Sequence, residues 1–356
     1  MILSQISADA SPNYEYVNAV VRARAERLLR REAFLRLASG SLEDLELFLL
    51  ESQYGPRYRE QLAAGRASLL ERIENALSAG AADLLVETAL LATGETFVFL
   101  SLILSMGDLY NGRILLRASP GSLRQKNPPS WHRYSLASTS FYDDLWKKHP
   151  SPAAGAIRCH EEDHDIARIL GSAYMTLHET GDLFLAERAF YTLWSEWWKK
   201  QTGRRNNANS RRMAEYLGRL TDLWNFSIWL RRSRERDERT EYFPGGWSLR
   251  REVLEEADDR QGLLGGSDWN FAAPLFEGSS ESEVFRSFQR FFYEWQRGLY
   301  RKNLLGIDVL LGYSAQAVQE WKNLSLIAVG LSLRMSAAEI EDHIFLPGEG
   351  GARLHD

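Results

Sequence analysis

The amino-acid sequence predicts an all-α protein built from three helical lobes, and two observations support this prediction. Apolar residues recur at helical spacing over most of the chain, and no segment shows the alternating apolar and polar pattern of a β-strand. In addition, one signature occurs three times: an acidic residue, an apolar residue at plus one, an asparagine at plus three and an apolar run at plus six to plus eight. The copies contain Asp108 and Asn111, Asp222 and Asn225, and Glu320 and Asn323.

The signature repeats at intervals of roughly one hundred residues, which is too long for a solenoid repeat and suits three small lobes. On a helix, the asparagine and the residue at plus seven lie on one face, so we expect that face to be buried. An asparagine inside a helix costs roughly 0.5 kcal/mol relative to alanine, because its amide competes for backbone groups. Its repeated use predicts a fixed structural hydrogen-bonding role, such as capping a neighbouring helix end. Arg117 and Arg231 stand at plus nine in the first two copies, whereas the third has Val329.

The first lobe is expected to cover residues 1–118 and to contain five helices. The predicted helices span residues 14–37, 42–54, 58–77, 81–91 and 96–118. Ser39-Gly40, Gly55-Pro56, Gly80 and Gly94 are expected to separate them, because glycine and proline interrupt helical patterns. Ser41 and Asp44 have the spacing of a capping box at the start of the second helix.

Residues 119–159 are rich in proline, serine and aromatic side chains, and we expect a long connection there. The second lobe is predicted at residues 160–261, with helices at 164–177, 183–200 and 210–239. Several of the eleven tryptophans of the chain are concentrated in this lobe, and five of them are expected to pack in its core: Trp194, Trp197, Trp198, Trp224 and Trp229.

The third lobe is predicted at residues 262–346, where a stretch rich in glycine and serine, residues 262–280, comes first. Capping-box patterns at Ser280 and Ser336 are expected to begin two of its helices. Residues 347–356 have the composition of a loose tail.

Composition excludes several classes of function. With 356 residues and 44% hydrophobic content, the chain can bury a large core. A net charge of −5 argues against general nucleic-acid binding, which requires a concentrated excess of Lys and Arg. Cys159 is the only cysteine, so no disulfide can form within the chain, and a reducing cytoplasm is the natural compartment. We expect no signal peptide, because Met1–Pro12 has no basic region followed by an apolar core. We also expect no membrane span, because the most apolar window, Phe97–Met106, has about half of the ~20 residues that a span needs.

The sharpest candidate for catalysis is the segment His160-Glu161-Glu162-Asp163-His164, which matches the H-E-x-x-H zinc pattern. In that pattern two histidines on one helix face hold zinc and the glutamate acts as the base. Glu179 or Glu187 could supply a third ligand, so a zinc-dependent hydrolase is one alternative function. However, Glu162 and Asp163 are charged where a buried zinc-binding helix is normally uncharged, which favours an exposed acidic helix start.

No other pattern supports catalysis or cofactor binding. The sequence has no G-x-x-x-x-G-K-[ST] phosphate loop, so we do not expect the chain to hydrolyse ATP by itself. Gly245-Gly246 and Gly265-Gly266 follow no predicted strand and indicate turns. Cys159 and His160 are adjacent and therefore lack the geometry of a nucleophile and its base. We predict no catalytic residue, no cofactor and no metal.

Two arginine clusters permit a further alternative, a generic helical scaffold that binds peptides or nucleic acid. The first, between Arg204 and Arg212, surrounds an asparagine-rich loop; the second, between Arg231 and Arg239, alternates with acidic residues and is typical of a solvated helix face. Neither this scaffold nor a hydrolase needs three lobes, so the triplicated signature favours a different function.

Three groups of residues carry a resemblance to a known family. They are the opening Tyr14–Ala23, the segment Leu109–Ala118 around the first signature asparagine, and the close of the chain from Gly306 to Glu341. In their order and spacing, together with the triplicated asparagine, these segments resemble the C subunit of the bacterial and archaeal V/A-type rotary ATPases, the counterpart of the d subunit of the eukaryotic vacuolar enzyme. Residues 120–154 match nothing typical of that family, and Arg334-Met335-Ser336 replaces a Gly-Leu-Pro-like turn before the last helix.

The resemblance implies a funnel of three pseudo-threefold-related helical lobes on the cytoplasmic face of the membrane. Such a protein is a non-catalytic adaptor of the central stalk in ATP-linked proton or sodium transport. Its implied partners are the central-shaft subunits and the membrane proteolipid ring, with no nucleic acid and no membrane span of its own. It binds no nucleotide and must transmit torque, which requires stiff helices and broad interfaces.

Overall fold

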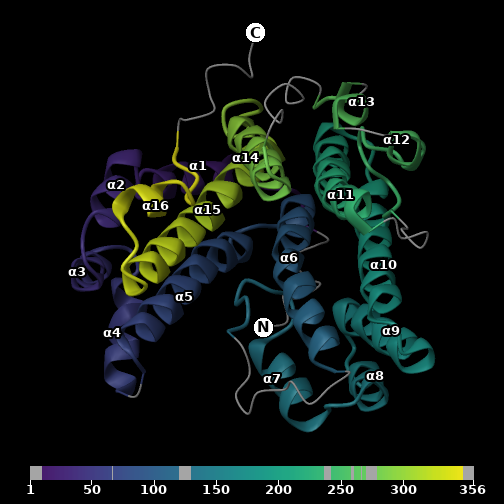
Figure 1. Ribbon diagram of the computed structural model, residues 1–356, viewed down its shortest axis with the longest axis horizontal. Helices are drawn as coiled ribbons and strands as arrows, with labels where there is room; N and C mark the ends of the chain where they lie inside the picture. The colour runs from purple at the N-terminus through teal and green to yellow at the C-terminus, as the bar shows by residue number, and fades with distance from the viewer. Residues whose placement is uncertain are drawn as a thin grey trace.

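The computed structural model describes residues 10–65, 67–119, 130–235, 242–257, 260–265, 267–269 and 279–347. Within these ranges the chain is helical and contains no β-strand, which confirms the predicted all-α class (Figure 1). The predicted tail, residues 347–356, lies outside the described residues except for Pro347.

The first half of the chain forms α1 (Tyr14–Ala25), α2 (Arg31–Ala38), α3 (Leu42–Glu51), α4 (Gly55–Ala64), α5 (Leu69–Leu90), α6 (Gly94–Ala118), α7 (Thr139–Lys148), α8 (Pro152–His160) and α9 (Asp165–Thr180). The second half forms α10 (Leu183–Gly203), α11 (Ala208–Glu235), α12 (Arg251–Glu256), α13 (Arg260–Gly265), α14 (Glu281–Leu299), α15 (Ile307–Ser332) and α16 (Ala337–Glu341).

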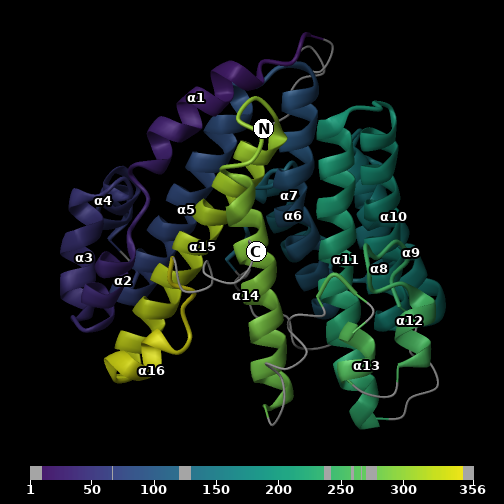
Figure 2. The same cartoon turned by 90° about the horizontal axis from the view of Figure 1, so that it is seen from above.

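Three long helical hairpins organise the molecule: α5 with α6, α10 with α11, and α14 with α15. The second helix of each hairpin carries one copy of the signature. Each hairpin also packs against both of the others, because α5 contacts α15, α14 contacts α11, and α10 contacts α6. The six helices therefore form a closed ring, which can be followed in Figures 1 and 2, with the shorter helices packed on its outside.

The buried apolar side chains form two clusters. The larger one joins α5 and α6 to the helices of residues 139–317. The smaller one combines α2 to α5 with the end of α15 and with α16, and includes Phe34, Tyr54 and Ile340. Segments from the two ends of the chain thus share one core, and the expected boundary between the lobes at 1–118 and 262–346 runs through it. The division into three lobes remains a prediction.

Several predicted helix starts are confirmed. Ser41, Ser280 and Ser336 each cap a helix, and in each case the acidic residue three positions later completes a capping box. The predicted break at Gly94 is also confirmed, since α6 begins there with a left-handed φ of 59°. A Cβ atom at Gly94 would lie 2.2 Å from the carbonyl oxygen of Ala10, so only glycine fits.

Four expectations about the elements are wrong. The helix predicted at 58–77 is interrupted, because α4 ends at Ala64 with a left-handed Gly65 after it and α5 begins only at Leu69. The helix predicted at 14–37 is two helices, α1 and α2. The break expected at Gly80 does not exist, because α5 continues through it; the glycine is needed where Tyr54 packs closely against that helix. The expected long connection, residues 119–159, contains α7 and α8, whose first turns are capped by Ser138 and Ser151.

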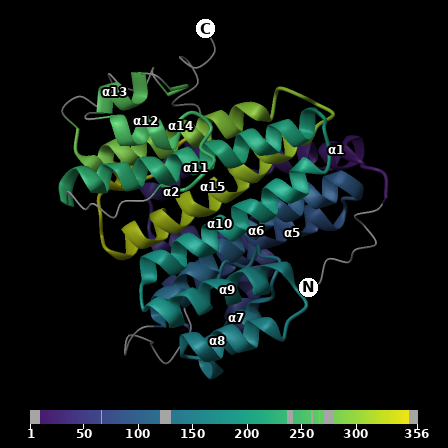
Figure 3. The same cartoon turned by 90° about the vertical axis from the view of Figure 1, so that its right-hand side faces the viewer.

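Among the described helices, α6 alone is long and apolar enough by composition to cross a membrane. However, 67% of its apolar window is buried inside the protein. Figure 3 shows α6 between α5 and α10, and it packs against both of these helices.

Candidate partner-binding site

The three hairpins are tied together at the end where their helices turn. Glu95 in the first turn of α6 is buried and accepts hydrogen bonds from Tyr14 (2.9 Å), Asn207 (2.7 Å) and Asn209 (3.1 Å). The side-chain oxygen of Asn209, near the start of α11, in turn accepts from the backbone amide of Ile307 at 3.0 Å, at the start of α15. We call this set of contacts the hub; it fixes the starts of the three signature helices relative to one another.

The three signature asparagines each bind one residue of the chain segment that follows. Asn111 holds both backbone groups of His132, donating to its carbonyl (3.0 Å) and accepting from its amide (2.8 Å). Asn225 binds Phe243 in the same way (2.9 and 2.8 Å), and Asn323 binds Phe345 (2.8 and 3.1 Å). The side chains thus clamp backbone that lies outside the helices and do not cap a helix end, which corrects the expected form of their role. The predicted burial of their face is confirmed, since all three are at most 1% exposed.

The first two signature acids hold the segment that leads into the next helix. Asp108 accepts from the amides of Leu136 (2.7 Å) and Ala137 (2.9 Å), directly before α7, and from the hydroxyl of Tyr142 (2.6 Å). Burial raises the pKa of Asp108 to about 7, even though these donors favour the ionised form.

Asp222 makes the same contacts before α12, with the amides of Ser248 and Leu249, both at 3.0 Å. Burial raises its pKa as well. In the first two copies, the aspartate at the same position of the signature therefore does the same thing: it binds the backbone amides just before the next helix.

The third acid, Glu320, has partners from the other end of the chain. It accepts from the amide of Leu29, just before α2, and from the side chains of Gln53 and Tyr54, both at 2.8 Å. Burial again raises the carboxyl pKa. The amino-terminal segment thus occupies, beside the third signature helix, the place that α7 and α12 occupy beside the first two.

The two signature arginines do not share a role. Arg117 forms an ion pair with Glu187 of α10, and Arg113 lies 3.5 Å from the same carboxylate. Arg231 donates to the carbonyl of Ser227 on its own helix at 3.1 Å. Val329, at the equivalent place in the third copy, lines the cavity described next.

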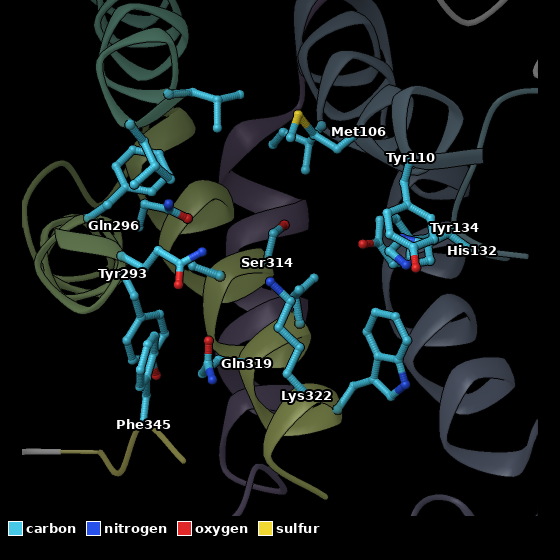
Figure 4. Close-up of a pocket in the computed structure, with 18 of the residues that line it drawn as sticks. Met106, Tyr110, His132, Tyr134, Tyr293, Gln296, Ser314, Gln319, Lys322 and Phe345 are labelled. Atoms are coloured by element: carbon cyan, nitrogen blue, oxygen red, sulfur yellow. The ribbon is translucent and has the colours of Figure 1, made fainter. Parts of the chain in front are cut away.

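A cavity of about 790 Å³ lies between the signature helices. Its wall includes α6 from Ile103 to Arg113, α11 from Tyr216 to Trp224 and α15 from Leu311 to Val329, with α14 on one side. The hub residues are not among its lining residues, so the cavity lies farther along the helices than the end at which they are tied together. Figure 4 shows Lys322 of α15 extending into the space between Tyr293 and Phe345 on one side and Tyr110 and His132 on the other.

The lining combines large apolar and aromatic side chains with basic groups. Arg113, Arg286 and Lys322 contribute positive charge, and none of the described lining residues is an aspartate or a glutamate. The Tyr110 and His132 rings stack with centroids 3.7 Å apart. Burial and the neighbouring Lys322 charge lower the pKa of His132 to about 3, so this imidazole is neutral at physiological pH.

Lys322 is exposed to the solvent in the cavity, although protein surrounds it on most sides. This confinement lowers its pKa from the usual lysine value. Among the described residues no carboxylate lies within ion-pair distance of it. A cavity with this wall offers apolar contact area and uncompensated positive charge, but no group positioned for chemistry.

The structure does not favour the zinc-hydrolase alternative. His160 is the last residue of α8, and His164 caps α9, where its ring nitrogen accepts from the amide of Ile166 at 3.2 Å. The two histidines therefore do not lie on one helix face. Within the described ranges, no group of three or more potential ligands could hold a metal ion.

The first arginine cluster is partly neutralised inside the protein. Arg212 pairs with Asp308 at 2.8 Å and also with Glu215, and Arg205 lies 3.6 Å from Glu95. Part of the second cluster, including Arg236 and Arg239, lies outside the described residues. Cys159 is buried and its pKa is raised to about 12, which agrees with its expected inertness.

The central cavity was not found by sequence reasoning, because its wall combines residues from distant helices. One signal was present: Lys322 stands between the signature residues Glu320 and Asn323 and is the only basic residue of α15. Only the packing of three hairpins shows that this lysine points into an enclosed space.

Comparison with known proteins identifies related sequences. The family described as ATP synthase (C/AC39) subunit matches residues 17–343. The chain is also similar to the C subunit of the A-type ATP synthase of Methanosphaera stadtmanae, with 24% identity over 331 residues that cover 88% of this chain and 83% of the relative.

Proposed function

The chain belongs to the ATP synthase (C/AC39) subunit family, and from this premise we propose that it couples the central shaft of a V/A-type rotary ATPase to the membrane proteolipid ring. The family is a non-catalytic part of the complex, so the chain is not an enzyme. The proposal places the protein on the cytoplasmic face of the membrane, held there by its partners.

The single observation that carries the proposal is the central cavity inside a closed ring of helical hairpins. A part that transmits torque needs a socket that does not deform when its occupant turns. The hub at one end of the signature helices and the three asparagine clamps along them restrain that socket. We assign the foot of the shaft to this cavity.

The signature residues serve this function indirectly. Their side chains are directed at backbone groups of the same chain, so they act as a scaffold and leave the partner surface to other residues. The equivalent tasks of Asp108 and Asp222 support an origin of the three lobes in a triplicated unit.

The hub end of the molecule is assigned to the proteolipid ring. There the turn between α14 and α15 exposes Leu304 (51%) and Leu305 (64%) to solvent. Exposed leucines next to each other are suited to a protein contact. A body with three lobes cannot match a ring of many identical subunits, so this contact must adapt to different ring positions. Each stable interface should bury about 1,600 Å² or more.

The two assignments can be tested separately with two variants. Ser325→Trp fills the cavity, whereas Leu304→Glu combined with Leu305→Glu places charge on the hub end. Each variant is co-expressed with the shaft and proteolipid subunits of the parent complex, and retained partners are measured after affinity purification. We expect the first variant to lose the shaft and keep the ring, and the second to lose the ring and keep the shaft.

Ile157→Glu is the matched control, because Ile157 is 64% exposed on α8, away from both surfaces. It should retain both partners. The proposed function is wrong if the unaltered chain retains neither partner, and the two assignments are wrong if both variants lose the same partner.

A further inference from the structure

The charge of the central cavity differs in sign from that of the chain. The protein as a whole has 48 acidic and 43 basic residues. The described cavity wall, in contrast, contains Arg113, Arg286 and Lys322 but no acidic residue. This inference rests on the proposed function and concerns the chemistry of the segment that enters the cavity.

The three basic side chains are not equally available to a partner. Arg113 lies 3.5 Å from the Glu187 carboxylate, and Arg286 donates to the backbone carbonyl of Asp342 at 2.9 Å. Lys322 has neither kind of contact with the part of the chain that the structure describes. It is exposed, and it extends from α15 into the space between the aromatic walls (Figure 4).

An occupant that fills the cavity displaces the water around Lys322. An ammonium group that loses water without gaining a counter-ion is strongly unfavourable, whereas a carboxylate from the occupant compensates for the lost hydration. The aromatic and aliphatic lining requires, at the same time, that most of the inserted surface be apolar.

The size of the cavity fits the end of a helix. A helix about 10 Å across rises about 5.4 Å per turn, so each turn fills roughly 400 Å³. The volume of about 790 Å³ therefore accommodates about two turns.

From these observations we propose that the shaft segment in the cavity is an amphipathic helix end that presents an aspartate or glutamate side chain to Lys322. Arg113 and Arg286 add positive charge around it without being its main partner. Lys322 thereby selects an acidic segment over a basic or purely apolar one.

The test measures the dissociation constant between the purified chain and the purified shaft subunits for four forms of the protein. Lys322→Met keeps the length of the side chain and removes its charge, Lys322→Glu reverses the charge, and Lys322→Arg preserves it. We expect the methionine variant to bind about 30-fold more weakly or worse, because it leaves a buried carboxylate unpaired. The glutamate variant should bind still more weakly, and the arginine variant should stay within about threefold of the unaltered chain.

Lys200→Glu is the matched control, since Lys200 is exposed on α10 and does not line the cavity. Because Lys322 is itself exposed, unchanged thermal unfolding should show that all variants remain folded.

Equal weakening of shaft binding by Lys322→Glu and Lys200→Glu overturns the proposal and indicates only a general charge effect. If Ser325→Trp abolishes shaft binding while Lys322→Met has no effect, the shaft occupies the cavity but the acidic contact is wrong. If the unaltered chain does not bind the shaft at all, the proposed function itself fails.

Discussion

Asn111, Asn225 and Asn323 each occupy a helix interior, where asparagine is mildly unfavourable. Each compensates for this cost by pairing an N–H and a C=O of a segment that passes over the helix. Without the amide, these backbone groups would be left in a largely buried place with no partner. The role is structural and demands both atoms of the amide, which explains why neither aspartate nor serine appears at these positions.

Replacing one clamp should therefore destabilise the protein markedly. We predict that Asn225→Ala lowers the free energy of unfolding by about 2–4 kcal/mol, since two hydrogen bonds are lost and two backbone groups at Phe243 remain unsatisfied. Urea unfolding followed by circular dichroism measures this difference. Asn206→Ala, on the exposed loop before α11, should change stability by less than about 0.5 kcal/mol. Similar values for both variants would show that Asn225 is not a clamp.

The buried carboxyl of Asp108 should make stability depend on pH. Its pKa is raised from the usual 3.8 to about 7, so between these values the folded state binds more protons than the unfolded state. The stabilising contribution is therefore fully present below about pH 4 and is lost as the pH rises to about 7. We predict that the chain loses stability over this range relative to Asp108→Asn, which cannot titrate. Unfolding free energies of both proteins across this range provide the measurement, and a relative gain in stability with rising pH would contradict the account.

At the residue scale, the sequence could predict that the signature residues are buried and form hydrogen bonds. It could not identify their partners, because these are backbone groups. Every residue type has a backbone carbonyl and nearly every type a backbone amide, so the partner residue's type gives no signal. The glutamate of the third copy is informative in retrospect: its longer side chain reaches Leu29 and Tyr54, which come from the opposite end of the chain.

At the scale of the elements, the sequence patterns predicted helix starts correctly where both residues of a capping box were present. Capping boxes located the starts of α3, α14 and α16, since each satisfies exposed amides by short-range contacts alone. The helices α7 and α8 were missed within a region rich in proline, although Ser151 followed by Pro152 is a favourable helix start. The expected break at Gly80 was wrong because a tertiary contact, the Tyr54 ring, explains that glycine.

The backbone just after the end of α15 is strained, and a single substitution should relieve this strain. Arg334, after the end of α15, has a left-handed φ of 59°, and Met335 donates to the carbonyl of Gly330 at 2.9 Å, as in a helix end that normally uses glycine. We predict that Arg334→Gly raises the free energy of unfolding by about 0.5–1 kcal/mol.

The matched variant Arg334→Ala separates this effect from the loss of the arginine side chain. Alanine has the same difficulty with a left-handed φ, so it should give no gain in denaturant unfolding. Equal stabilisation by both variants would show that the side chain, and not the backbone, is responsible.

At the scale of the whole molecule, the chain closes on itself. The hairpins form a ring by way of α5 and α15, and the segment that completes the third signature helix belongs to the amino-terminal part of the chain. No local pattern encodes this closure, because it joins residues that are nearly three hundred positions apart, as in the contact between Leu29 and Glu320. The all-α class and the family follow from the sequence, whereas the cavity follows only from the closure.

The closed ring supports the proposal that this non-catalytic family member acts as a mechanical part of a rotary complex. A cavity lined by residues of all three hairpins would hold the proposed shaft helix without any covalent chemistry, and the hub ties the hairpins together at one end. In the proposed function the role of the molecule is mechanical, and it depends on which partner enters the cavity.

The most direct test of this claim is a crosslink from inside the cavity in the assembled complex. Ser325→Cys supplies a reactive thiol there, and the native Cys159 does not compete because it is buried and its pKa is raised to about 12. The thiol is labelled with a photoactivated crosslinker, the complex is assembled with shaft and ring subunits, and the products are identified by mass spectrometry, with labelled Ile157→Cys as the outer-surface control. We predict a crosslink from position 325 to a shaft protein, whereas a crosslink to the proteolipid ring or to a stator protein would contradict the account.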